Sequence, residues 1–314
     1  MAEQHKLENL LGIEDLDLSS IRRLLDLGKS FKSELENGKK KFDHLRERTV
    51  VNLFFEPSSR TRSSFEMAAK RLGADNINFV ADSSTSVSKG ETLLDTAKIL
   101  EAMSPDYLVL RHESAGAPQL LSQELDIPVI NAGDGFHEHP SQALLDAMTI
   151  EAKKGKIEGL KVAIIGDIAH SRVARSNIYL LNKMGAKVTV CGPPTLLPPY
   201  VERLQVAETH SVQEAIADAD VVMMLRIQFE RQNTKQIPSN AEYYRFYGLN
   251  NETATQLKPD AIIMHPGPMN RGVEISPQVA DGSNSVILHQ VTNGVAIRMA
   301  ILAALEEDRF GRRV

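Results

Sequence analysis

The sequence predicts an α/β protein with two doubly wound parallel-sheet domains and an active site in the cleft between them. Short apolar runs typical of buried strands alternate with amphipathic helical segments, and polar clusters recur where the strands end. The 314 residues are enough for two domains, each with its own core. We place the first domain at residues 1–150 and the second at 151–290. The last helix, about 291–314, is expected to pack back on the first domain.

The first half begins with an amphipathic helix and continues as alternating strands and helices. We expect that first helix to run from about Ser19, a suitable N-cap, to Glu36. The expected strands are 50–55, 76–80, 107–111 and 128–131, and the expected helices are 60–72, 91–103, 117–124 and 140–152. Alternation with short connections implies a parallel sheet covered by helices.

The second half repeats this layout after a basic, glycine-containing junction at 153–159. Its expected strands are 162–165, 187–190, 221–225 and 261–264, again with helices between them. A final apolar helix is expected over 285–306. The two halves therefore predict two similar layered domains.

Composition excludes several classes of function. The formal net charge of −5 argues against non-specific nucleic-acid binding, which needs a basic surface. The first residues lack the pattern of a signal peptide, and no apolar run approaches the length of a membrane span. The single cysteine, Cys191, follows a strand and is expected to be a buried thiol. We therefore expect a cytoplasmic enzyme without nucleic-acid or membrane partners.

The strongest functional motif follows the strand at 50–55. The chain there continues as Glu56-Pro57-Ser58-Ser59-Arg60-Thr61-Arg62 and enters a helix. Amide N–H groups of a first helical turn carry partial positive charge, so added hydroxyl and guanidinium donors form an anion site. A plain N-cap serine with surface arginines is the alternative, but a cap needs only one hydroxyl. Phosphate binding is therefore the preferred interpretation.

Other polar clusters also fall at the carboxyl ends of expected strands, where ligands of open α/β sheets bind. In the first half these are Ser58–Thr61, the loop 82–90 with Lys89, Arg111, and His139 with Gln142. In the second half they are Asp167–Arg172, Arg226 with Gln228, and His265–Pro268. Chance scatter would place many of them on exposed helix faces. The pattern predicts a cationic active site in the cleft.

We expect neither a nucleotide cofactor nor a metal. After the strand at 162–165 only Gly166 matches a dinucleotide-binding motif, and the bulky segment 167–172 follows it. His137-Glu138-His139 lacks the spacing of a zinc protease motif. His139 is better interpreted as a neutral residue before the helix that starts at Pro140, donating one hydrogen bond, with a simple capping histidine as the alternative. In the turn 265–268, the Gly267–Pro268 bond is a candidate for the cis form.

These motifs together resemble the aspartate/ornithine carbamoyltransferase family. The resemblance rests on residues 55–62, 89–91, 111–112, 139–142, 226–228 and 265–268, which occur in family order across almost the whole chain. Arg226-Ile227-Gln228 resembles the branch that uses aspartate. The Ser-Met-Gly segment and the late His-Cys-x-Pro turn of the ornithine branch are absent.

The resemblance implies transfer of the carbamoyl group of carbamoyl phosphate to the amine of L-aspartate, a step of pyrimidine biosynthesis. It implies that phosphate is bound by Ser58, Ser59, Arg60, Thr61, Lys89, Arg111 and either Thr85 or Ser86. Donors to the carbonyl oxygen would be Thr61, Arg111 and His139, and the amide would be held by Gln142 and the turn Pro266, Gly267 and Pro268. Aspartate would be bound by Lys89, Arg172, Arg226 and Gln228. Glu56 would pair with Arg172 and Arg231 when the domains close.

The resemblance also implies a homotrimer in which Lys89 enters the site of the adjacent chain. A regulatory chain or a dihydroorotase is a further partner compatible with the resemblance. Two alternative functions stay open at this point. One is a carbamoyltransferase for another amine such as ornithine, and the other is a non-catalytic two-domain protein that binds anions.

Overall fold

The computed structural model describes residues 6–80, 90–227, 237 and 239–311, which divide into two compact units. The first contains residues 1–145 and 292–314, and the second contains residues 146–291. Both boundaries fall inside long helices, α5 (Pro140–Lys154) and α11 (Ile287–Phe310). The polypeptide therefore passes between the units within continuous helices.

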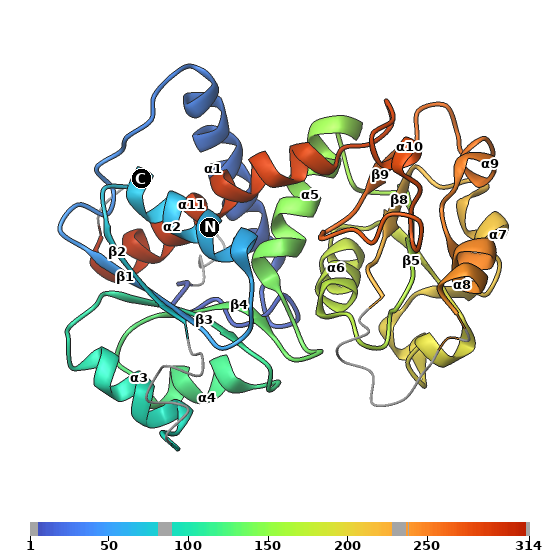
Figure 1. Ribbon diagram of the computed structural model, residues 1–314. Coiled ribbons are helices and arrows are strands. Elements are labelled where there is room, and N and C mark those ends of the chain that lie inside the picture. Colours follow the sequence, from blue (N-terminus) through green and yellow to red (C-terminus); the bar gives the residue numbers. More distant parts are fainter. Residues whose placement is uncertain (1–5, 81–89, 228–236, 238, 312–314) are drawn as a thin grey trace. The chain divides into compact units, whose positions relative to one another are not determined.

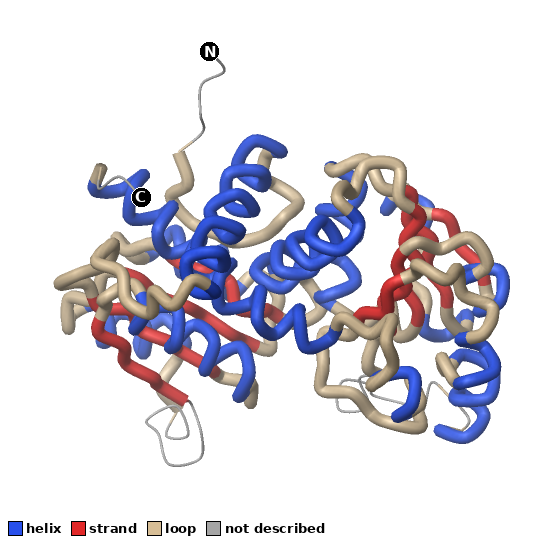
Figure 2. The backbone as a smooth tube through the Cα atoms, turned by 90° about the horizontal axis from the view of Figure 1, so that it is seen from above, coloured by secondary structure: helices blue, strands red, loops and turns tan. Residues whose placement is uncertain are grey.

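The first unit is built on a four-stranded parallel sheet (Figure 1 and Figure 2). Its strands are β1 (Thr49–Phe54), β2 (Asp75–Val80), β3 (Tyr107–His112) and β4 (Val129–Asp134), in the order β2-β1-β3-β4. Helices α3 (Leu93–Glu101) and α4 (Ala117–Glu124) cover one face; α1 (Leu18–Glu36), α2 (Ser59–Arg71) and α11 lie on the other. The winding direction therefore reverses between β1 and β3.

Alternating side chains of the strands explain this layering. Val51 and Leu53 of β1, with Leu108 and Leu110 of β3, form one apolar cluster with buried residues of α3 and α4. The intervening residues of each strand point to the opposite face, because successive side chains of a strand alternate. Strands buried on both faces are typical of a parallel sheet between helices.

The second unit contains a five-stranded parallel sheet. Its strands are β5 (Lys161–Ile165), β6 (Lys187–Cys191), β7 (Ala207–Thr209), β8 (Val221–Met224) and β9 (Ile262–Met264), in the order β7-β6-β5-β8-β9. Its helices are α6 (Arg172–Lys183), α7 (Val212–Ile216), α8 (Asn240–Tyr247), α9 (Asn251–Ala254) and α10 (Pro277–Ala280). Here the winding direction reverses between β5 and β8.

Cys191 is buried at the end of β6, as the sequence predicts. Burial raises the pKa of its thiol to about 12, so the thiolate needed for nucleophilic chemistry is disfavoured. We therefore interpret Cys191 as a packing residue of the second core.

Three local expectations differ from the structure. The N-cap of α1 is Asp17, whose carboxylate accepts the Ser20 N–H at 2.7 Å, so Ser19 lies inside the helix. Helix α3 starts later than expected because Thr92 and Asp95 form a capping box. Strand β7 was not expected, since its three residues include no apolar run and gain strand geometry by pairing with β6.

Helix α11 corrects the expectation that no apolar run approaches the length of a membrane span. It is 24 residues long, and an 18-residue window has a mean hydropathy of 1.3. However, 72% of that window is buried inside the structure, as in the core helix of a soluble protein. Length and composition alone therefore do not distinguish α11 from a membrane helix, whereas its packing does.

Candidate active site

In the first unit, the predicted phosphate motif lies at the point where the winding of the sheet reverses. Phe54 at the end of β1 pairs with Arg111 of β3, and the Phe55 N–H donates to the Arg111 carbonyl at 2.9 Å. The motif that follows β1 and the side chain of Arg111 therefore leave the same edge of the sheet. Ligands of doubly wound sheets bind at such reversal points, beyond the carboxyl ends of the strands.

The first turn of α2 has the properties of an anion site. Ser58 is the N-cap residue, but its hydroxyl makes no capping hydrogen bond within the described residues, and the turn contains no acidic residue. Ser59 and Arg60 are exposed, while Thr61 is buried at 8% exposure. Ser58 thus occupies the N-cap position without a side-chain capping bond, and phosphate binding by this turn stays a prediction. The backbone N–H groups of this first turn have no carbonyl partner within the helix, so they can donate to a bound anion.

Arg111 is held from two sides within the first unit. Its Nη1 donates to the Ala132 carbonyl of β4 at 3.1 Å, and its Nε lies 3.2 Å from Glu56 Oε2. The sequence-based prediction pairs Glu56 with Arg172 and Arg231. Arg231 lies outside the described residues, and the pairing of Glu56 with Arg172 stays a prediction. The structure shows Arg111 as a partner of Glu56. Glu56 therefore contributes to the orientation of a predicted substrate-binding guanidinium.

His139 lies immediately before α5, as predicted. Its carbonyl accepts the N–H groups of Gln142 at 2.9 Å and Ala143 at 3.3 Å, which fixes its position at the start of the helix. His139 is 4% exposed and Gln142 is 8% exposed. Whether the ring of His139 is neutral stays a prediction.

Asp134, at the end of β4, organises the loop that precedes His139. Its Oδ1 accepts Asn131 Nδ2 at 2.8 Å and the Glu138 N–H at 3.1 Å, while its Oδ2 accepts the Gly116 N–H at 2.8 Å and lies 3.1 Å from His137 Nδ1. Burial alone would raise the pKa of Asp134, but the bonds from His137, Gly116 and Asn131 outweigh it and lower this pKa. This role could not be predicted from the sequence, because Gly116 is distant along the chain.

Glu138 ties the same loop to the N-terminal segment. Its carboxylate accepts the Ile13 N–H at 2.8 and 2.9 Å and the Glu14 N–H at 3.0 Å. A Cβ on Gly12 would lie 2.4 Å from Glu138 Oε1, so a larger residue there would displace this carboxylate. Ligand atoms of Glu14, His137 and Glu138 lie within 4.8 Å of one another. Because amide donors already occupy the Glu138 carboxylate, we interpret this cluster as structural.

In the second unit, predicted site residues also leave the sheet where its winding reverses. Gly166 follows β5 with φ +138°, and a Cβ there would lie 2.9 Å from both the Cβ and the carbonyl oxygen of Leu225, which follows β8. The glycine lets these two chain segments approach. Arg226 comes directly after Leu225, and Arg172 is the first residue of α6, with 3% exposure.

The turn after β9 has the predicted cis bond between Gly267 and Pro268. His265 is fully buried, and its ring and amide contact Glu274, Gly267 and Gln290. Of the remaining predicted site residues, Thr85, Ser86, Lys89, Gln228 and Arg231 lie outside the described residues.

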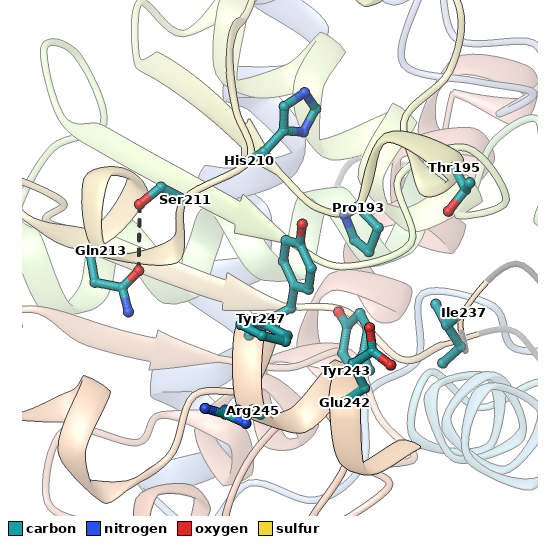
Figure 3. Close-up of a pocket in the computed structure, with 11 residues that line it drawn as sticks. Pro193, Thr195, His210, Ser211, Gln213, Ile237, Glu242, Tyr243, Arg245 and Tyr247 are labelled. Carbon is teal, nitrogen blue, oxygen red and sulfur yellow. Dashed lines mark hydrogen bonds between the residues drawn. The ribbon is translucent and has the colours of Figure 1, made fainter. Parts of the chain in front are cut away.

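A cavity of about 560 Å³ lies elsewhere in the second unit (Figure 3). Tyr243 and Tyr247 of α8 lie in its wall, their rings stacked with centroids 5.6 Å apart. Pro193 and His210 face them from other segments (Figure 3). None of the predicted site residues lines this cavity, so the cavity does not mark the predicted site.

Family comparison agrees with this distribution of residues. Residues 8–152 match the carbamoyl-P binding domain of aspartate/ornithine carbamoyltransferases. Residues 158–305 match the Asp/Orn binding domain of the same proteins. The chain belongs to the aspartate/ornithine carbamoyltransferase family.

Individual carbamoyltransferases are also similar to this chain. The aspartate carbamoyltransferase catalytic subunit of Syntrophotalea carbinolica is 59% identical over 302 residues, which cover 96% of each chain. A Trypanosoma cruzi aspartate transcarbamoylase bound to N-(phosphonacetyl)-L-aspartic acid is 32% identical, with a TM-score of 0.87 and 95% and 96% of the two chains covered. The ornithine carbamoyltransferase of Pyrococcus furiosus is 30% identical, with a TM-score of 0.84 and 96% and 98% covered. The fold of the carbamoyltransferases therefore does not by itself identify the acceptor amine.

Proposed function

We propose that this chain is the catalytic chain of an aspartate carbamoyltransferase. It transfers the carbamoyl group of carbamoyl phosphate to L-aspartate, giving N-carbamoyl-L-aspartate and phosphate. The observation that carries this conclusion is the 59% identity, over 96% of both chains, to a catalytic subunit of that name. Arg226-Ile227-Gln228, which resembles the aspartate-specific branch, supports the same acceptor.

The first unit is proposed to bind carbamoyl phosphate. Donors in the first turn of α2, together with Arg111, surround the phosphate, and Lys89 with Thr85 or Ser86 completes this site. Thr61, Arg111 and His139 donate to the carbonyl oxygen, where negative charge develops as the amine attacks. Preorganised donors stabilise such a charge, and the loss of one typically costs about 3–4 kcal/mol of barrier.

The second unit is proposed to bind aspartate. Arg172, Arg226 and Gln228 contact its two carboxylates, for which the forked donors of arginine are well matched. The amine of aspartate attacks the carbonyl directly, so no side-chain nucleophile is required. The departing phosphate accepts the proton of the amine, and the carbonyls of Pro266 and Gly267 hold the carbamoyl amide.

We propose further that the enzyme acts in the cytoplasm as a homotrimer with sites shared between adjacent chains. The resemblance in the segment around Lys89 and the absence of any requirement for a membrane or nucleic-acid partner in the reaction support this proposal. A regulatory chain or a dihydroorotase would be an additional partner, detectable by copurification.

The test is a turnover assay with three candidate acceptors. The purified protein is incubated with carbamoyl phosphate and L-aspartate, L-ornithine or no amine, and the carbamoylated product and phosphate are both measured. We expect product only with aspartate. Product with ornithine alone would identify the other family branch, and binding of carbamoyl phosphate without any transfer would identify a non-catalytic anion-binding protein.

A further inference from the structure

The turn after β9 is anchored by buried side chains at three backbone N–H groups. The His265 N–H donates to Gln290 Oε1 at 3.0 Å, the Gly267 N–H donates to His265 Nδ1 at 2.7 Å, and the Asn270 N–H donates to Glu274 Oε1. His265 and Glu274 are at most 1% exposed and Gln290 is 3% exposed. The path of the turn is therefore set at its start, middle and end.

The hydrogen bonds also assign the tautomer of His265. A backbone N–H only donates, so Nδ1 must accept from Gly267 and the ring proton is on Nε2. His265 Nε2 lies 3.2 Å from Glu274 Oε1 and donates to it. Glu274 Oε1 thus accepts both the His265 ring and the Asn270 N–H. One carboxylate oxygen joins the histidine that holds the middle of the turn to the residue at its end.

Gln290 connects the start of the turn to the helices of the second unit. Its Nε2 donates to Asp146 Oδ1 at 2.7 Å, and Asp146 Oδ2 accepts Asn177 Nδ2 at 2.9 Å. Asp146 lies on α5, Asn177 on α6 and Gln290 on α11. The amide of Gln290 therefore links the backbone of His265, through Asp146, to α5, α6 and α11 by hydrogen bonds.

Two acceptors of the anchored turn are left available. Within the described residues, no hydrogen bond ends on the carbonyl of Pro266 or Gly267, and both residues are partly exposed. Pro266 and Pro268 have no N–H group, and the Gly267 N–H already donates to His265, so residues 266–268 present acceptors and no available backbone donor. An acceptor pair of this kind selects a ligand with an N–H group over one with a methyl group.

We propose that Glu274 and Gln290 are positioning residues that give the site its preference for a carbamoyl over an acetyl group. This inference deepens the proposed function and rests on it. Carbamoyl phosphate and acetyl phosphate share the phosphate and the carbonyl, and differ in that an NH₂ group in the first replaces a methyl group in the second. Only the NH₂ group donates to the Pro266 and Gly267 carbonyls, so the preference between the two compounds reports how well the turn is positioned.

The experiment measures dissociation constants of carbamoyl phosphate, acetyl phosphate and inorganic phosphate for the intact protein and four variants. Glu274→Leu leaves the His265 ring and the Asn270 N–H without their acceptor, and Gln290→Met does so for the His265 N–H. We expect each to lower the carbamoyl-to-acetyl preference by at least about tenfold, with phosphate affinity retained. Glu274→Gln keeps an acceptor oxygen at the same place and should restore most of the preference.

The controls separate this inference from general damage and from the proposed function. Glu202→Leu makes the same chemical change at an exposed position of the same unit and should leave all three constants unaltered. An unchanged preference in a folded Glu274→Leu or Gln290→Met protein overturns the inference, as does a loss of phosphate affinity equal to the loss of preference. If the unmodified protein transfers no carbamoyl group, the proposed function itself is wrong.

Discussion

At the scale of single residues, the site depends on polar side chains whose orientation is set by other polar side chains. Arg111 is the clearest case, because one guanidinium contacts both Glu56 and the Ala132 carbonyl. A planar fork with several donors suits this arrangement, whereas the ammonium of lysine is a point charge on a flexible stem. A lysine at position 111 would therefore keep the charge but not both contacts of Arg111.

Arg111→Lys should reduce kcat/KM for carbamoyl phosphate by about 100-fold, although the net charge is preserved. The measurement is carbamoyl-aspartate formation at saturating aspartate. Glu56→Gln, which keeps an acceptor for Arg111, is the matched control and should lose less activity. Near-normal turnover by Arg111→Lys would show that only the charge matters.

Asp134 should make stability depend on pH in the acid range. Its pKa in the folded protein is below the ordinary value of 3.8, so its contribution is present above that value and is lost as the pH falls through the folded pKa. Asp134→Asn replaces one carboxylate oxygen by an NH₂ group that faces the donors around Asp134. We expect it to lower the free energy of unfolding by about 1–3 kcal/mol at pH 5. Urea unfolding at pH 5 and at pH 3 should give a smaller difference at the lower pH. An equal difference at both would exclude this titration as the source.

At the scale of elements, α11 is held to the first sheet by one buried ionic cluster. Arg48, just before β1, donates through Nη2 to Glu306 Oε1 at 3.0 Å, and its Nη1 lies 3.1 Å from Asp106 Oδ1. Tyr107 of β3 also donates to Glu306, which is 1% exposed. Burial and the neighbouring Glu306 raise the pKa of Tyr107, so this hydroxyl stays a donor. The cluster joins α11 to the start of β1 and to β3.

Neighbouring glutamates of α11 provide a paired stability test. Glu306→Ala leaves Arg48 and Tyr107 without their acceptor and should cost about 3–5 kcal/mol, because removing one partner of a buried pair exposes the desolvation cost of the other. Glu307→Ala removes a more exposed contact to Arg23, 2.8 Å long, and should cost about 1 kcal/mol or less. Chemical unfolding of both variants gives the comparison. Equal losses would argue that the buried cluster contributes no more than the exposed pair.

At the scale of the whole molecule, predicted substrate residues are divided between two units that each place them at a reversal of strand order. The sheet of the first unit reverses between β1 and β3, and that of the second between β5 and β8. The connections that follow the two neighbouring strands run to opposite faces of the sheet at such points and leave room for a ligand. Each unit would therefore provide part of the proposed site, and the proposed trimer would add Lys89 from an adjacent chain.

Mixed trimers test that shared site. Lys89→Ala and Arg111→Ala should each be nearly inactive alone, since each removes a cation that balances the charge of phosphate. After unfolding and refolding together, some interfaces would join an intact Arg111 to an intact Lys89, and activity should partly return. The assay is turnover as a function of mixing ratio. No recovery despite demonstrated chain exchange would assign Lys89 to the site of its own chain.

The sequence by itself determined the class of the fold and the family, and it predicted the residues of the site. Among the described residues, the sequence pattern located every strand except β7, because most of the other strands are apolar runs with local signatures. The segments 55–62, 139–142 and 265–268 were recognisable as motifs because the residues of each are consecutive in the chain. Helix α4 was predicted with its observed limits, Ala117–Glu124, because Pro118 marks its first turn.

Only the tertiary structure decided which residues hold that site in place. Glu138 binds the backbone of Ile13, 125 residues away, and Gln290 binds Asp146, 144 residues away. A glutamate or glutamine gives no local sign of such a partner, since its side chain is equally suited to solvent. A polar group can be buried without a large cost only when the fold places a hydrogen-bond partner beside it. For Glu138 and Gln290 that partner comes from a distant part of the chain, so only the folded structure shows it.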